Sequence, residues 1–193
     1  MRRLIIFLIL AWPGFLFSQD AISVFDNHTG LKEGVYTSLP EIMENSPKYY
    51  NCQFESKINF WFGKTSEYYV DTSGIRHEFK DSILMVVEDG DKYVKYKNGF
   101  CRLIRTGAIS TFMIDNTIVY SNGYQNTQTS LLFWDVLTGK MGKLTITSMD
   151  EIFKRDNYIY SVYSGLSGSE KKQALFSYVL QYNEHNPIYL HIE

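Results

Sequence analysis

The chain has 193 residues, 21% of them charged and 16% aromatic, and its formal net charge is −2. This slightly acidic balance argues against electrostatic binding to nucleic acid, which depends on clustered lysine and arginine neutralising phosphates. Loss of an N-terminal segment carrying Arg2 and Arg3 would make the remainder more acidic still. The remaining ~175 residues are the size of one domain and can bury a large hydrophobic core.

The first 18 residues have the order of a secretory signal peptide. Arg2 and Arg3 form a short basic region, an apolar run covers residues 4–17, and Ser18 supplies a small residue after it. The alternative is a retained transmembrane anchor, but a membrane-spanning helix needs about 20 apolar residues and this run is shorter. We therefore expect cleavage after Ser18, no transmembrane segment in the mature chain, and export to the periplasm or the medium.

The segment before residue 50 is expected to form a brief strand and a short helix. The strand ends at Tyr36, and Ser38 and Glu41 then have the spacing of a capping box, in which each side chain binds the other's backbone N–H. Asn45 and Pro47 predict the end of the helix.

Residues 52–147 alternate short β-rich runs with turn residues, which indicates an antiparallel sheet. The strongest hairpin signal is Asn98-Gly99, because a type I′ turn requires two residues that tolerate positive φ. A turn is also expected at Asp115-Asn116, and an exposed loop over residues 121–130, which lack an apolar period. Trp61 and Trp134 are expected in the core. The spacing favours about six to nine strands curled into a roll, half-barrel or sandwich. The other expected turns are Ser73-Gly74, Asp89-Gly90, Thr106-Gly107, Asn122-Gly123 and Thr138-Gly139.

Helices are expected to return near the C-terminus, followed by one short strand or an extended tail over residues 188–192. The longest helix should begin at a Ser167–Glu170 capping box and end before Pro187. Its apolar arc, which includes Leu175 and Val179, predicts that it packs against the sheet. A further helix start is expected at a Ser148–Glu151 capping box, and Asp156 is expected to cap a short turn over residues 158–163. The sequence thus predicts one α+β domain over residues 19–193, mainly β over 34–147 and helical over 148–186.

The two cysteines, Cys52 and Cys101, leave two alternatives open. Export would place both in an oxidising compartment, where a disulfide between them is a candidate. The alternative is two separately buried free thiols, the common state of unpaired cysteine. Neither has the CxxC or Cys/His spacing of a redox or zinc site.

No motif in the chain fixes a chemistry or implies a cofactor. Residues 138–145 contain a Gly-Lys pair, but Leu137 and Leu144 occupy the positions where a phosphate-binding loop requires glycine and Ser or Thr. The four histidines show no spacing typical of a metal site. Several tyrosines could form an aromatic binding surface, although packing within and across strands explains them as well. The candidates are Tyr68, Tyr69, Tyr93, Tyr96 and Tyr124.

Several short motifs occur together along the chain. A signal peptide precedes a Gly-x-Tyr segment, a short helix with Asn-x-Pro, an Asp-Gly hairpin and a terminal helix ending in Tyr-Asn-x-x-x-Pro. This arrangement resembles a family of uncharacterised exported Bacteroidetes proteins, a domain of unknown function. The resemblance implies a bacterial envelope or secreted location, and it implies no activity. The matching positions are Gly34, Tyr36, Asn45, Pro47, Asp89, Gly90, Tyr182, Asn183 and Pro187.

The leading functional hypothesis is a non-catalytic exported interaction module at the bacterial cell envelope, whose partner is an unknown envelope protein or glycan. One alternative is a hydrolase of envelope or extracellular polymers. A third interpretation is a glycan-binding domain. Two convergent carboxylates or a Cys–His contact in a cleft would favour the hydrolase, whereas a flat aromatic strip would favour glycans.

Overall fold

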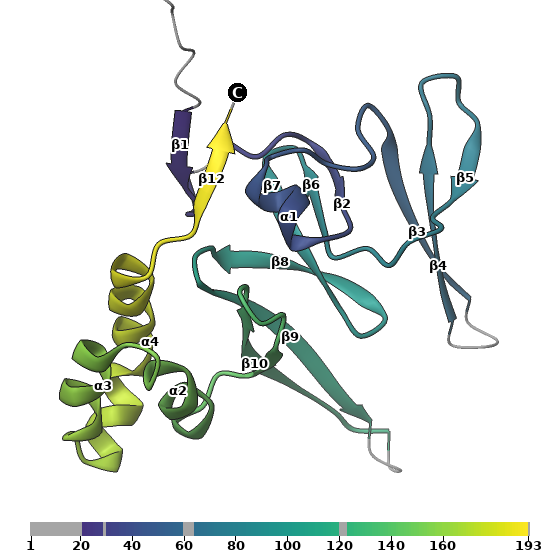
Figure 1. Ribbon diagram of the computed structural model, residues 1–193. Coiled ribbons are helices and arrows are strands. Elements are labelled where there is room, and N and C mark those ends of the chain that lie inside the picture. Colours follow the sequence, from purple (N-terminus) through teal and green to yellow (C-terminus); the bar gives the residue numbers. More distant parts are fainter. Residues whose placement is uncertain (1–20, 29, 60–63, 120–122, 193) are drawn as a thin grey trace, which may run out of the picture.

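The computed structural model describes residues 21–28, 30–59, 64–119 and 123–192, which form an α+β fold (Figure 1). Its centre is a seven-stranded antiparallel sheet that curls into a half-barrel. Three helices lie at one end of this sheet, and a separate three-stranded sheet lies on its other side (Figure 1). The predicted fold class is confirmed, and the main sheet has a number of strands within the expected range.

The elements have the following bounds. The main sheet has the spatial order β11 (Met141–Lys143), β10 (Gln125–Asp135), β9 (Ile109–Val119), β8 (Gly99–Arg105), β7 (Asp91–Tyr96), β6 (Met85–Glu88) and β2 (Gly34–Tyr36). The second sheet consists of β3 (Gln53–Asn59), β4 (Lys64–Val70) and β5 (Arg76–Glu78). A two-stranded ribbon pairs β1 (Ala21–Val24) with β12 (Tyr189–Ile192). The helices are α1 (Leu39–Met43), α2 (Ile146–Phe153), α3 (Asn157–Ser164) and α4 (Gly168–His185).

The main sheet is buried on both faces near β2, β6 and β7. Successive side chains of a strand point to opposite faces, so Met85 and Val87 enter the main core while Val86 between them enters a second cluster. We call this second group the junction cluster, because it joins the two sheets. It consists of Val35, Ile83 and Val86 with the partly buried side chains of Tyr49, Phe54, Phe79, Tyr93 and Phe100. An ion pair between Lys95 and Glu67, 2.6 Å long, also links β7 to β4.

Helix α4 packs against the sheet, as its apolar arc predicts. Val179 and Tyr182 are buried in the main core. The Asn183 side chain then binds the start of β9 twice, because its Oδ1 accepts from the Ile109 N–H at 2.7 Å and its Nδ2 donates to the Ile109 carbonyl at 2.9 Å. Position 107, in the turn between β8 and β9, requires glycine, because a Cβ there would lie 2.5 Å from Asn183 Nδ2.

One hairpin forms as predicted and another is shifted by a residue. Asp89 and Gly90 both adopt positive φ, 51° and 77°, and they form the tight turn between β6 and β7. The Asn98-Gly99 prediction was wrong in detail, since Tyr96 pairs with Gly99 and the turn residues are therefore Lys97 and Asn98. Lys97 takes the left-handed conformation with φ 55°.

The turn expected at Asp115-Asn116 and part of the loop expected over residues 121–130 are also wrong. Strand β9 continues through Asp115, and residues 125–130 belong to β10, which pairs with β9 along its whole length. Thr129 donates a side-chain hydrogen bond to Asp115 at 2.6 Å across the two strands. Residues 125–129 are exposed, so this part of the strand carries no apolar period even though its backbone is paired.

The helix caps confirm some of the expected signals and correct others. Ser167 and Glu170 form the predicted capping box of α4, and Asp156 caps α3. Helix α2 starts earlier than predicted, because its box is formed by Thr145 and Ser148 instead of Ser148 and Glu151.

The first expected box is likewise incomplete. Ser38 is the N-cap residue of α1 but makes no side-chain cap. The Glu41 carboxylate instead accepts hydrogen bonds from the backbone N–H and the hydroxyl of Thr37, at 2.6 and 2.9 Å.

Residues 189–192 form the strand β12, and its partner is β1, a strand that the sequence analysis does not predict. The main core includes Trp134, as predicted. Trp61 and the expected signal peptide, residues 1–18, lie outside the described residues. None of the helices that the structure describes is long and apolar enough to cross a membrane.

Candidate functional site

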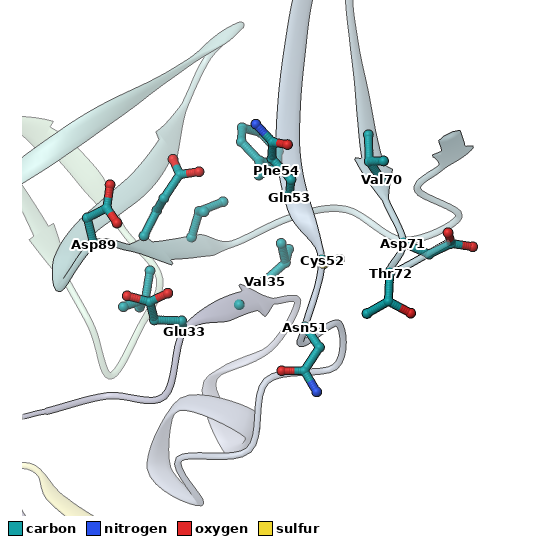
Figure 2. Close-up of a pocket in the computed structure, with 14 residues that line it drawn as sticks. Glu33, Val35, Asn51, Cys52, Gln53, Phe54, Val70, Asp71, Thr72 and Asp89 are labelled. Atoms are coloured by element: carbon teal, nitrogen blue, oxygen red, sulfur yellow. The ribbon is translucent and has the colours of Figure 1, made fainter. Parts of the chain in front are cut away.

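A cleft of about 490 Å³ lies where the edge of the main sheet meets the second sheet (Figure 2). The main sheet contributes residues 33–35 and 86–89, and the second sheet contributes residues 51–54 before and within β3 and residues 70–72 at the end of β4. The floor is apolar, because Val35, Val86 and Phe54 belong to the junction cluster. The fold therefore supplies a polar opening over a hydrophobic base.

Three carboxylates form one side of the cleft, and we call Glu33, Glu88 and Asp89 the acidic wall. The antiparallel register that pairs Gly34 with Val87 places Glu33 beside Glu88, and Asp89 follows in the β6–β7 turn. All three side chains are exposed. Among the described residues that line the cleft, none is lysine or arginine. The wall therefore concentrates negative charge that no cation of the cleft itself neutralises.

A fourth carboxylate, Asp71, lies across the cleft from Glu33 and Asp89 (Figure 2). It is already engaged, since one oxygen lies 2.7 Å from His77 Nε2 and the other accepts the backbone N–H groups of Ser73 and Ile75, each at 2.9 Å. The hydrogen bond from His77, with help from these N–H groups, lowers the pKa of Asp71. Asp71 thus shapes its own loop and adds negative charge to the far side of the cleft.

The two cysteines lie in different surroundings. Cys52 lines the cleft, whereas Cys101 lies on β8 and packs against the main core. Both are free thiols, so the candidate disulfide is not formed in this structure. Burial raises the pKa of both thiols. Because the thiolate is the reactive form of cysteine, this shift makes Cys52 a weaker nucleophile.

The five candidate tyrosines do not gather on one surface. Tyr93 belongs to the junction cluster, and Tyr69 contacts the Phe79 and Tyr49 rings of that cluster at centroid distances of 5.1 and 5.0 Å. The remaining three lie in different surroundings. Tyr96 packs edge-on against the core residue Phe112, Tyr68 lies beneath the Arg76 guanidinium, and Tyr124 is 63% exposed near the start of β10. Packing therefore accounts for most of these side chains.

The histidines occupy separate positions. His77 stacks on Tyr69 at 4.9 Å beside its Asp71 partner, and His185 stacks on Tyr158 at 5.0 Å. Within the described part of the chain, no group of three or more His, Cys, Asp or Glu residues is placed to hold a metal ion.

The sequence interpretation missed the acidic wall. The sequence predicts a role for Asp89 only in the Asp-Gly turn, and it predicts none for Glu33 or Glu88. The available signal was the position of acids directly before β2 and directly after the apolar part of β6, but their convergence depends on the pairing of two strands separated by about 50 residues, which a local pattern does not give.

Comparison of the chain with family models, curated proteins and solved structures found no match.

Proposed function

We propose that this protein is an exported, non-catalytic binding module of the bacterial envelope, and that its cleft binds a cationic segment of another envelope protein. The order of Arg2, Arg3 and the apolar run up to Ser18 supports export. The observation that carries the binding proposal is the acidic wall over an apolar floor.

The chemistry of the cleft selects the kind of ligand. Carboxylates accept hydrogen bonds from lysine ammonium and arginine guanidinium groups, and charge complementarity speeds encounter and excludes acidic partners. The apolar floor beneath Glu33 and Glu88 offers contact to aliphatic side chains or to the stems of lysine and arginine. A basic peptide segment with apolar residues combines both properties. A glycan would need exposed aromatic faces, and Tyr124 is the one candidate tyrosine that is mostly exposed.

Two observations favour binding over the hydrolase alternative. The acidic wall is exposed, so it lacks the burial by which a catalytic site excludes water from a reacting carboxylic acid. In addition, the pKa of the Cys52 thiol is raised by burial, the opposite of what a nucleophilic cysteine requires.

The test measures by calorimetry the binding of a short peptide that contains lysine and leucine. The comparison peptide has glutamate in place of each lysine. Each exposed ion pair contributes about 0.2–1 kcal/mol, so the double variant Glu33→Gln/Asp89→Asn should weaken binding by roughly 2- to 25-fold. Asparagine at position 89 also suits the left-handed backbone there. Glu184→Gln, an exposed change on α4 outside the cleft, is the matched control and should leave Kd unchanged.

Binding should also weaken as salt is raised, because exposed charges are screened. Equal binding of the basic and acidic peptides would overturn the proposal, as would a Kd that the double variant leaves unchanged. Preferential binding of neutral oligosaccharides would favour the glycan interpretation instead.

A further inference from the structure

A buried lysine marks a second site on the other side of the β6–β7 hairpin. Lys92 is 8% exposed and belongs to the same face of β7 as the core residue Val94. Lysine is almost never this buried unless its charge is paired. Among the described residues, Lys92 makes no hydrogen bond or ion pair, and it feels Asp26 and Asp91 only through longer-range attraction.

The two nearby carboxylates are engaged elsewhere. Asp91 forms an ion pair with Arg102 at 2.6 Å. Asp26 accepts the backbone N–H of His28 at 2.8 Å. Burial is the main influence on the Lys92 ammonium and lowers its pKa, and the two carboxylates offset this only in part. Within the part of the chain that the structure describes, the fold therefore leaves a positive charge in a largely buried place without a direct counter-ion.

Lys92 lines a small pocket of about 150 Å³ together with Asn27, Thr106 and the ion-paired Asp91 and Arg102. The Asn27 side chain is occupied, because its Nδ2 donates to the Ile104 carbonyl at 3.1 Å and its Oδ1 accepts the Thr106 N–H at 2.7 Å. Asn27 therefore holds the pocket wall in place and does not neutralise Lys92. The groups left to bind a ligand are the Lys92 ammonium and the guanidinium N–H groups of Arg102 that Asp91 does not use.

We propose that this pocket binds a carboxylate group of a ligand, with Lys92 as its counter-ion and Arg102 as a second donor at the rim. A carboxylate fits the small volume and carries a single negative charge. A phosphate dianion would meet stronger repulsion from Asp26 and Asp91, which lie close enough to act on the same ammonium. This site is separate from the cleft and does not depend on the function proposed for it.

The experiment compares melting temperatures in acetate, sulfate, phosphate and chloride at one ionic strength and pH. Acetate at about ten times its Kd should raise the Tm of the wild-type protein by about 3–6 °C relative to chloride. Lys92→Met keeps a similar shape and removes the charge, so it should lose this increment. Lys172→Met, which removes an exposed lysine on α4, is the matched control and should respond as the wild type does.

A second measurement uses the unaltered protein and so does not depend on the folding of a variant. Titration of the isotope-labelled wild type with acetate should produce saturable shifts of the backbone amide signals of Lys92 and Arg102, and none at Lys172. The double variant Glu33→Gln/Asp89→Asn should give the same acetate response. The proposal is overturned if the wild type and Lys92→Met show the same change in Tm with every anion and these amide signals do not move. A larger Lys92-dependent increment with sulfate or phosphate than with acetate would refute the carboxylate assignment.

Discussion

Replacement of Val179 by aspartate should abolish the folded state of the whole domain. Val179 lies on α4 and is fully buried in the main core. Losing its buried apolar side chain costs about 1.5–3 kcal/mol. A buried aspartate must also stay protonated at pH 7 or pay a larger desolvation penalty. Protonating a group of pKa near 3.9 at pH 7 costs about 4 kcal/mol at 1.36 kcal/mol per pH unit. The total of about 5–7 kcal/mol is comparable with the full stability of a typical domain.

Two further positions on α4 give a graded comparison for this change. Leu175 is half-buried, so an aspartate there can turn toward water, and Leu175→Asp should cost clearly less than Val179→Asp. Gln173 is exposed, and Gln173→Asp adds the same charge to the same helix with little effect. Urea denaturation followed by far-UV circular dichroism measures all three. A Val179→Asp protein whose unfolding midpoint matches that of Gln173→Asp would refute the packing of α4 on the sheet.

Two further predictions concern the backbone and the pH dependence of stability. Gly34→Ala should destabilise the domain by several kcal/mol and lower its Tm, because φ is 143° there and the added Cβ would lie 2.3 Å from the Tyr49 carbonyl oxygen; a Tm equal to that of the wild type would contradict this. Asp156→Ala should cost about 1–2 kcal/mol in urea unfolding at pH 7 through loss of the α3 cap. The hydrogen bond from the Ile159 N–H is the main cause that lowers the pKa of Asp156 in the folded state. Its contribution is therefore present above the unfolded pKa near 3.9 and is lost as pH falls through the folded pKa. The difference between the two proteins should shrink below about pH 4, and a constant difference would refute this account.

Local signals in the sequence were sufficient for the elements whose side chains act on their own backbone. Asp156 and the Ser167–Glu170 box set the starts of α3 and α4, and Asp89-Gly90 sets a turn, because each works within four residues. The apolar arc of α4 likewise predicted its packing. These features follow from capping and periodicity alone.

The rest depended on contacts between distant segments. The exposed outer half of β10 has no apolar face, so only its pairing with β9 makes it a strand. The acidic wall is a further example, since strand pairing places Glu33 beside Glu88. Lys92 is another, because Asp91 forms its ion pair with Arg102 instead. No signal in the neighbourhood of any of these residues reports such an arrangement.

The ribbon of β1 and β12 has a consequence for how the chain folds. Its register pairs Ala21 with Ile192 and Val24 with Tyr189, so residues 25–188 lie between the two partners. Strand β1 therefore stays without its partner until residues 189–192 are also free to fold. Closing so long a loop is slow compared with forming hairpins such as β6–β7. The central sheet can therefore assemble first, and the pairing of β1 with β12 is expected to form late in folding.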